Sequence, residues 1–325
     1  MASPCGAIPS VRIFGDEKLA IREISSILNQ HSDQLTGLIT PLLRIGEREQ
    51  KAISALHIAS ETTVAWETNE KALRALLPLH APFTNAISVP GSMNFTSRSS
   101  AVESSAYSSA AMVLAHLVRD WATVGLKTRK RVHGPVLREL RRLRQEKQRP
   151  LSVLVPGAGT SRLAWDIARH GNRVEANDVS AAMLIAAHTL MKGFEQTGVS
   201  QRHYEVYPHL QCAHGIVRRA ACLTAHAIPE KETMCKLQPH HSVKAIGLQG
   251  WLTLQVGSWL EPDNPPAEFG ALRHENGTFD SVVTSYFLDT QRDPIKTILR
   301  VRSMLQPGGL WINVCALRVL IDQMR

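Results

Sequence analysis

The chain has 325 residues, of which 44% are apolar and 20% are charged. These fractions exclude a mainly disordered, collagen-like or coiled-coil protein, and the length allows one large domain or two smaller ones. The net charge is +9, from 37 Lys and Arg against 28 Asp and Glu. Five cysteines without a CxxC pair argue against a disulfide scaffold. With no bilayer-length apolar run and no secretory signal pattern, we expect a cytoplasmic protein, with the nucleus as a second compartment and no membrane partner.

Residues 1–95 are predicted to form an N-terminal helical region. Apolar residues recur at helical spacing between residues 16 and 80, without the alternation of a strand. Ile24, Ile27 and Leu28 are one such group, and Leu73, Leu76 and Leu77 are another. Half of residues 96–109 are serines, which is typical of a linker. We therefore expect a boundary near residue 100 and a second domain over residues 110–325.

Two helices are expected next, one over residues 110–125 that ends at a glycine and one that is strongly basic. Residues 127–149 hold ten basic and two acidic residues, a local charge of +8, so the rest of the chain holds 27 basic and 26 acidic residues. An apolar stripe predicts that the arginines lie on the solvated side. It consists of Val136, Leu137, Leu140 and Leu143. Since no aromatic residues or RNA motif accompany the charge, we expect a solvated helix face and no nucleic-acid partner.

From residue 151 strands alternate with helices. Short apolar runs predict strands at 152–155, 173–177, 252–256, 280–285 and 310–314, with helices at 161–170, 180–194 and 294–305. Five strands joined by helices predict an α/β fold with a doubly wound parallel sheet. Six histidines and three cysteines fall between His203 and His241, but their spacing matches no zinc site, so no metal is expected.

A glycine turn in residues 153–171, VLVPGAGTSRLAWDIARHG, stands between a strand and a helix. Such a turn lets the backbone approach a ligand and points helix N–H groups at it. Gly157 and Gly159 are the first two glycines of a dinucleotide fingerprint. Arg162 stands at the third position, and Ser161 stands where a GxGxG pattern has its last glycine.

Asp178 ends the second strand about 20 residues after Gly157, where a carboxylate can accept hydrogen bonds from the ribose hydroxyls of an adenosine cofactor. The alternative is that Asp178 only caps the helix that starts at Ser180. This pattern suits NAD and S-adenosylmethionine equally.

The loop, together with ANDVS at residues 176–180, resembles the carnosine N-methyltransferase family, whose members carry a VPGAGLGRLAWEIA-like loop followed by an acidic residue and a serine. Three further stretches agree. LVRDWATVG (117–125) resembles the family's FVRDWSEEG-like helix, and VYPHL (206–210) resembles its LYPW element. FDSVVTSYFLDT and LQPGGLWINV (279–290 and 305–314) resemble its last two parallel strands. The motifs follow the family order.

This resemblance implies a Rossmann-like methyltransferase that moves a methyl group from S-adenosylmethionine to an imidazole nitrogen of carnosine or a related histidine-containing small molecule. After the third strand the family has Gly-Asp-Phe where this chain has Gly257, Ser258 and Trp259, and one turn before Arg119 it has glutamine where this chain has His116. The implied cofactor-binding residues are Arg119, Gly157, Gly159, Asp178, Ser258, Trp259 and Ser285.

Asp289 is the predicted catalytic residue. It follows the fourth strand, at the sheet edge where doubly wound folds bind ligands, and it matches the aspartate of the family's FFIDT element. A carboxylate there would hold one N–H of the acceptor imidazole, fix its tautomer and stabilise the cation that forms. The alternative is a helix-capping aspartate before Thr290.

Members of the family continue past the strand at 310–314 through two further strands, so the resemblance implies that C-terminal strands are missing here. Leu310, Trp311 and Ile312 would then lie on an exposed edge strand, which favours self-association or a homodimer. Two functions are therefore open: the methyltransferase, and a truncated, non-catalytic remnant that binds S-adenosylmethionine. A nicotinamide-dependent dehydrogenase is third.

Overall fold

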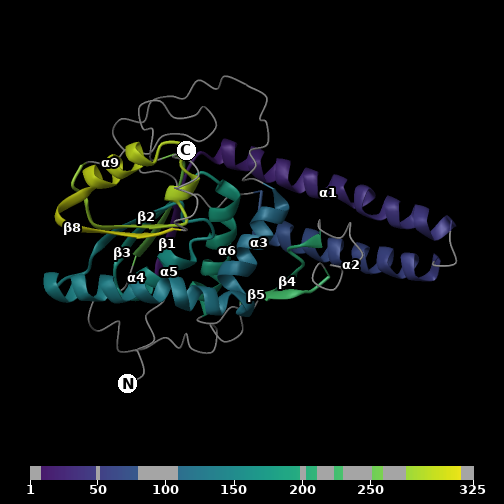
Figure 1. Ribbon diagram of the computed structural model, residues 1–325, viewed down its shortest axis with the longest axis horizontal. Helices are drawn as coiled ribbons and strands as arrows, with labels where there is room; N and C mark the ends of the chain where they lie inside the picture. Colours follow the sequence, from purple (N-terminus) through teal and green to yellow (C-terminus); the bar gives the residue numbers. More distant parts are fainter. Residues whose placement is uncertain are drawn as a thin grey trace, which may run out of the picture.

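A six-stranded parallel sheet forms the centre of the protein (Figure 1). The structure is a computed structural model, and it describes residues 9–48, 52–79, 109–197, 203–210, 223–229, 251–258 and 276–315. The strands are β1 (Ser10–Phe14), β2 (Ser152–Pro156), β3 (Arg173–Asp178), β6 (Trp251–Val256), β7 (Phe279–Ser285) and β8 (Leu305–Val314). Their order, β1-β6-β3-β2-β7-β8, reverses direction between β2 and β7, as in doubly wound folds. The predicted fold class and its five strands are confirmed, and β1 is an additional strand.

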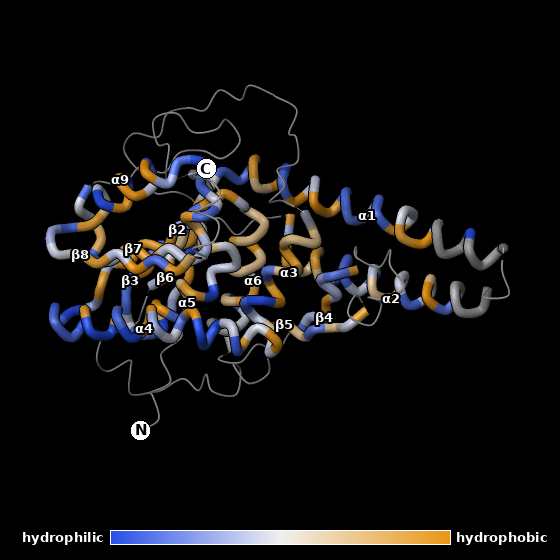
Figure 2. Tube along the Cα trace, in the orientation of Figure 1, coloured by the Kyte–Doolittle hydropathy of each residue, from blue (hydrophilic) through white to orange (hydrophobic). Residues whose placement is uncertain are grey.

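Helices cover the sheet on both sides. Figure 1 shows α9 above the strands and α4 below them. The helices are α1 (Glu17–Arg48), α2 (Ala52–Leu76), α3 (Ala110–Trp121), α4 (Leu126–Lys147), α5 (Arg162–Arg169), α6 (Ala181–Thr197) and α9 (Pro294–Met304). Hydrophobic residues gather along the central strands in Figure 2, because parallel strands are buried on both faces. None of the described helices is long and apolar enough to cross a bilayer.

The N-terminal region shares its core with the sheet. β1 pairs in parallel with β6, and α1 and α2 form a long hairpin that extends away from the sheet (Figure 1). Ile24 on α1 and Leu73 on α2 are fully buried in the same apolar cluster as Val153 on β2. The predicted helices before residue 80 are therefore present, while linker residues 96–108 lie outside the described residues. The domain boundaries stay a prediction.

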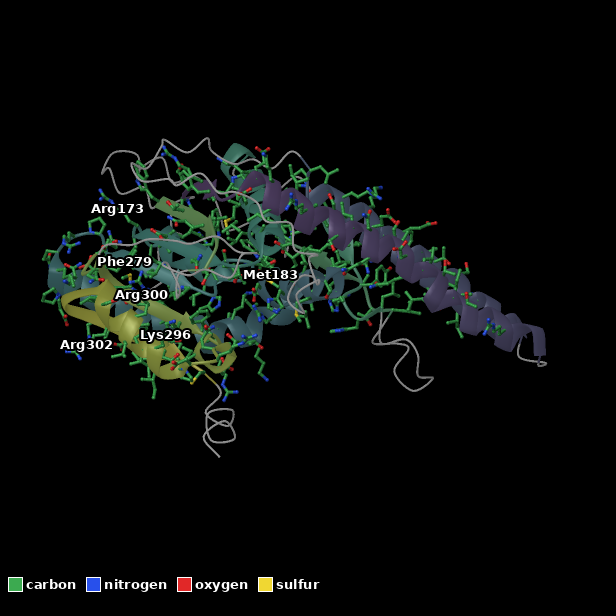
Figure 3. All side chains as sticks on the ribbon, turned by 90° about the horizontal axis from the view of Figure 1, so that it is seen from above. Arg173, Met183, Phe279, Lys296, Arg300 and Arg302 are labelled. Atoms are coloured by element: carbon green, nitrogen blue, oxygen red, sulfur yellow. The ribbon has the colours of Figure 1, made fainter. Side chains whose placement is uncertain are left out.

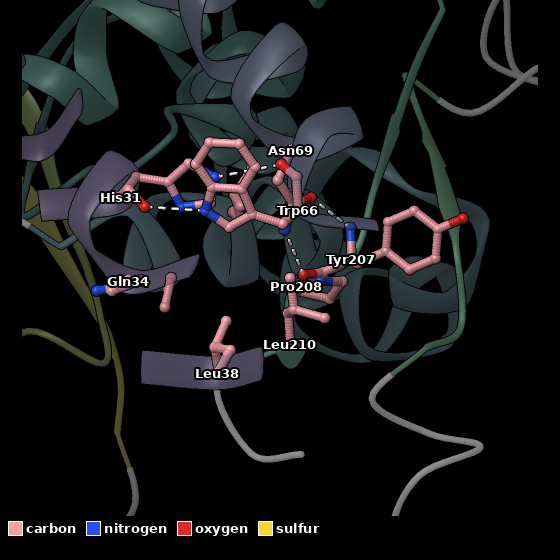
Figure 4. Close-up of a pocket in the computed structure, with 10 residues that line it drawn as sticks. His31, Gln34, Leu38, Trp66, Asn69, Tyr207, Pro208 and Leu210 are labelled. Carbon is pink, nitrogen blue, oxygen red and sulfur yellow. Dashed lines mark hydrogen bonds between the residues drawn. The ribbon is translucent and has the colours of Figure 1, made fainter. Parts of the chain in front are cut away.

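The stretch that contains VYPHL is fixed to this hairpin. It follows β4 (Tyr204–Val206), which pairs with β5 (His226–Ile228) in a small antiparallel sheet. Asn69 on α2 donates to the Tyr207 carbonyl at 2.9 Å and accepts from the Tyr207 N–H at 2.7 Å (Figure 4). Next to it Trp66 stacks on His31 and donates to the His31 carbonyl at 2.9 Å. The cavity here measures about 10 Å³, the size of a single water, so this is a packing contact.

One arginine of the basic helix α4 is buried in the interior of the protein. Its predicted apolar stripe is confirmed for Val136, Leu140 and Leu143, which are buried, and Figure 2 shows the helix to be mostly hydrophilic. Arg129 is buried as well, and it donates to the carbonyls of Arg119 and Ala122 at 3.0 and 2.8 Å. The prediction that the arginines lie on the solvated side is therefore wrong for Arg129, because the end of α3 leaves carbonyls that need donors.

The last described strand, β8, has a single neighbour, β7, in the described sheet. Leu310 and Ile312 are partly buried against the main apolar cluster, and Trp311 donates from its indole to the Thr284 hydroxyl at 2.9 Å. The predicted edge position is confirmed for the described residues. That further strands are missing, and that the edge promotes self-association, both stay predictions.

Asp280 on β7 is a fully buried carboxylate that joins four parts of the chain. It accepts two hydrogen bonds from Arg149, at 2.7 and 2.8 Å, one from the Ser152 N–H at 2.9 Å and one from Gln306 at 2.7 Å. Lys147 Nζ lies 3.0 Å away. Burial by itself raises the pKa of Asp280, but the donors outweigh it and hold that pKa below its usual range.

Replacing Asp280 with asparagine should lower the free energy of unfolding at pH 7 by about 2 kcal/mol, less than for a fully buried ion pair because Arg149 is half exposed. Since the pKa of Asp280 is lowered on folding, this contribution is present above about pH 4, the usual aspartate pKa, and is lost as the pH falls through the folded value. Denaturant unfolding at pH 7 and in acid measures it. Glu139→Gln, at an exposed carboxylate on α4, should change stability by less than about 0.5 kcal/mol. A difference between wild type and Asp280→Asn that stays constant into acid would contradict the prediction.

Candidate functional site

A cleft of about 680 Å³ lies at the carboxyl ends of β2, β3 and β7, where the strand order reverses. In Figure 3, Met183 on α6 and Lys296 on α9 mark two of the helices that line it. The sequence predicted that a ligand binds at this edge. Of the predicted site residues, the cleft is lined by Arg119, Gly157, Gly159, Asp178, Ser258 and Ser285. Trp259 lies outside the described residues.

The glycine turn between β2 and α5 has a backbone that side chains would disturb. Gly157 and Gly159 have φ angles of +63° and +53°, in the left-handed region that favours glycine. A Cβ on Gly157 would lie 2.2 Å from a ring carbon of Phe287. At Gly159 it would lie 3.5 Å from His116 Nδ1 and 3.8 Å from Arg119 Nη2. The missing side chain of Gly159 therefore leaves open space opposite α3.

Helix α3 fixes this turn through two consecutive residues. Asp120 accepts from the Thr160 hydroxyl at 2.6 Å, and Trp121 donates from its indole to the Thr160 carbonyl at 3.0 Å. Arg119 donates through Nε and Nη2 to the Asp120 carboxylate, at 2.7 and 2.9 Å. Burial raises the pKa of Asp120, but these donors outweigh it and lower the pKa. The RDW motif thus places an anchored guanidinium at the cleft.

Asp178 contacts both the glycine turn and the turn before α6. It is half-buried, and it accepts from the Gly159 N–H at 2.7 Å and from the Ser180 N–H at 2.9 Å. Burial, the largest cause, raises the pKa of this carboxyl. The capping interpretation therefore describes one of its contacts, and the bond to Gly159 is a second one that orders the ligand-facing turn.

His116 was noted in the sequence only as a departure from the family. Its Nδ1 is buried and has no hydrogen-bond partner among the described residues. Burial, and then the charge of Arg119, lower the pKa of His116 to about 4, so the ring is neutral at physiological pH. The sequence could have indicated that His116 belongs to the site, because residues 116 and 119 lie on one face of a helix. A buried nitrogen without a partner at a cleft is a group that a ligand can satisfy.

Asp289 lies beside the cleft rather than in its described lining. It belongs to a short 3-10 turn, η5 (Leu288–Thr290), whose neighbours Phe287 and Thr290 do line the cleft. One carboxylate oxygen, Oδ1, is buried without a partner in the part of the chain that is described. The helix cap of α9 is Asp293, which accepts from the Lys296 N–H at 2.9 Å. Asp293, and not Asp289, therefore caps this helix.

The family model for carnosine N-methyltransferase matches residues 96–324. The chain belongs to the carnosine N-methyltransferase family. It is 28% identical over 204 residues to the carnosine N-methyltransferase of Rattus norvegicus, covering 62% of this chain and 45% of the rat protein. The match to that of Schizosaccharomyces pombe is 26% over 204 residues, covering 62% of this chain and 49% of the yeast protein. The chain spans about half the length of these relatives.

Solved structures overlap the chain only partly. An arsenic(III) S-adenosylmethionine methyltransferase from Chlamydomonas reinhardtii is 16% identical, covers 50% of this chain and 37% of its own, and has a TM-score of 0.28. A protein from Pyrococcus horikoshii OT3 is 14% identical, covers 64% and 68%, and has a TM-score of 0.33. These scores are low, so the fold assignment rests on the strand order.

Ser161, the last residue of the glycine turn, is strained. Its φ is 56°, and its buried hydroxyl has no hydrogen-bond partner in the described chain. Ser161→Gly should therefore raise the free energy of unfolding by about 1 kcal/mol, since a left-handed residue with a Cβ costs about 1–2 kcal/mol and glycine loses part of that gain through its flexibility. Ser161→Ala is the matched control, because it removes the hydroxyl and keeps the strain. Denaturant unfolding measures the stability of both variants. If Ser161→Gly is no more stable than Ser161→Ala, the backbone of Ser161 is not strained.

Proposed function

We propose that this chain binds S-adenosylmethionine in the cleft and transfers its methyl group to an imidazole nitrogen of carnosine or a related histidine-containing small molecule. Family membership supports a methyltransferase. The observation that carries the proposal is the convergence of the glycine turn, Arg119 and Asp178 on one cleft at the switch point of the sheet.

The residues of the cleft fit the cofactor. The space beside Gly159 faces both Arg119 and the unpartnered His116 Nδ1. Arg119 uses the N–H of Nε and one N–H of Nη2 for Asp120, so its remaining N–H groups would bind the carboxylate of the methionine part. Asp178 has lone pairs beyond its hydrogen bonds to the N–H groups of Gly159, Val179 and Ser180, and it would accept from the ribose hydroxyls. When bound, S-adenosylmethionine supplies an electrophilic methyl group.

Asp289 would orient the acceptor. Its Oδ1 is buried and has no partner among the described residues, so a donor there would be favourable, and an imidazole N–H is such a donor. Holding that N–H would leave the other ring nitrogen neutral and directed at the methyl group. The carboxylate would also stabilise the positive charge that develops on the ring.

A second candidate function is the binding of S-adenosylmethionine without catalysis. Two observations favour it. Asp289 is absent from the described lining of the cleft, and Ser258 stands there without the charge of the acidic residue that the family has at this position.

Cofactor choice can be tested by calorimetric titration of the chain with S-adenosylmethionine and with NAD. We expect S-adenosylmethionine to bind more tightly. Asp178→Ala should weaken that binding by about 1–3 kcal/mol, because the ribose hydroxyls lose a buried acceptor. Tighter binding of NAD, or equal affinity of wild type and Asp178→Ala, would refute the assignment.

The role of Asp289 can be tested with a radiolabelled methyl-transfer assay on carnosine. Asp289→Asn keeps the shape of the side chain but removes its charge, so turnover should fall by roughly 10- to 1000-fold. Reversal of Arg141 and Arg142, on the exposed side of α4, should leave the rate unchanged. Full activity of Asp289→Asn would move the chemistry to another residue. A wild-type chain that binds the cofactor without turnover would favour the non-catalytic candidate.

A further inference from the structure

Helix α1 brings a carboxylate to the start of α6. Glu23 accepts from the Ser180 hydroxyl at 2.7 Å, from the Ala181 N–H at 2.8 Å and from the Ala182 N–H at 3.4 Å. The first N–H groups of a helix have no partner within the helix, and a side chain directly before it usually accepts from them. Ser180 accepts from the Met183 N–H in this way, at 3.4 Å. Glu23 is an additional acceptor, and it comes from a helix more than a hundred residues away in the sequence. It also lies outside residues 96–324, which match the family.

The same turn is held from the other side by Asp178. The Ser180 N–H donates to Asp178 at 2.9 Å, while the Ser180 hydroxyl donates to Glu23 at 2.7 Å. Ser180 is buried and therefore connects the two carboxylates directly. Asp178 and Ser180 line the cleft, and Glu23 is not part of its described lining. Asp178 and Ser180 therefore connect Glu23 to the cleft.

This arrangement divides the hydrogen-bond donors between the two carboxylates. Glu23 accepts from the N–H groups of Ala181 and Ala182, while Asp178 accepts from those of Ser180 and Gly159. Two negative charges near one turn repel each other, and Glu23 is one of the groups that raise the pKa of Asp178. The positive end of α6 compensates both charges. Both carboxylate oxygens of Glu23 thus act as acceptors at this turn.

We infer that Glu23 is a positioning residue of the cofactor site: through Ser180 and the start of α6 it holds Asp178 in the orientation that meets the ribose hydroxyls. The inference rests on the proposed binding of S-adenosylmethionine. It implies that helix α1, which the family match does not include, takes part in cofactor binding.

The test is calorimetric titration of the full chain with S-adenosylmethionine. Glu23→Gln keeps the length of the side chain, but its amide NH₂ would face backbone donors. We expect the affinity to fall about tenfold, which corresponds to 1.4 kcal/mol. Asp33→Asn, at an exposed carboxylate on the same helix, should leave the affinity unchanged. Thermal unfolding of each variant checks that it is folded.

A double-mutant cycle with Asp178→Asn separates positioning from a general loss of structure. If Glu23 acts through Asp178, Glu23→Gln should have little further effect in the Asp178→Asn background. Equal affinity of wild type and Glu23→Gln, or fully additive losses, would overturn the inference and leave the proposed function in place. A wild-type chain that does not bind S-adenosylmethionine would overturn both.

If Glu23→Gln does not fold, Glu23→Asp takes its place. It keeps the charge but shortens the reach by one methylene, so the hydrogen bonds to Ala181 and Ser180 should lengthen and the affinity should fall severalfold. Wild-type affinity in a folded Glu23→Asp variant would overturn the inference as well.

Discussion

The left-handed backbone of the turn between β2 and α5 is the constraint on which the site depends. Gly157, Gly159 and Ser161 all have positive φ angles, so the turn cannot be held by the hydrogen bonds of a regular helix or strand. Besides one hydrogen bond within it, from the Ser161 N–H to the Ala158 carbonyl, it is held from outside, by Asp178 at the end of β3 and by Asp120 and Trp121 on α3. The binding surface is therefore only as well ordered as the two elements that flank it.

Buried or half-buried carboxylates do most of this ordering, although the chain is basic. Asp120 joins α3 to the glycine turn, Asp178 joins β3 to it, and Asp280 joins β7 to the end of α4 and to β2. Each accepts at least two hydrogen bonds, which is what makes a buried charge tolerable. The positive charge lies on the outside of α4, while these single negative charges sit at the junctions between elements. Net charge therefore says little about the site.

The parts of the fold that could be predicted from the sequence are those that depend on local pattern. Apolar runs predicted the strands β2, β3 and β7 because parallel strands are buried on both faces, and the glycine turn was visible because glycine favours the left-handed φ angles of Gly157 and Gly159. β1 was not predicted. Its alternation, with Val11 and Ile13 buried, is only five residues long, and its partner β6 lies far along the chain. A local pattern of apolar residues indicates that a segment is buried, but it does not indicate which distant element packs against that segment.

The same limit applied to the site. Five of the six predicted residues on the cleft end or follow parallel strands, whose ends meet at one edge of the sheet, and the sixth, Arg119, comes from α3. Glu23 and Arg129 were not predicted to have such roles, because a glutamate or an arginine on an amphipathic helix is usually solvated. Their positions follow from unpaired N–H and carbonyl groups at the ends of α6 and α3, which exist only once the helices are packed.

The N-terminal segment contributes energy as well as contacts to the sheet. Val11 and Ile13 on β1, together with Ile24 and Ile27 on α1, are at most 1% exposed and belong to the main apolar cluster. Burying each such side chain is worth about 1.5–3 kcal/mol, and total stabilities are only about 5–15 kcal/mol. Without β1 and α1 the chain would lose a substantial part of that stability and would leave the backbone of β6 unpaired at the sheet edge. β1 and α1, which the family match leaves out, are therefore part of the structure that supports the cleft.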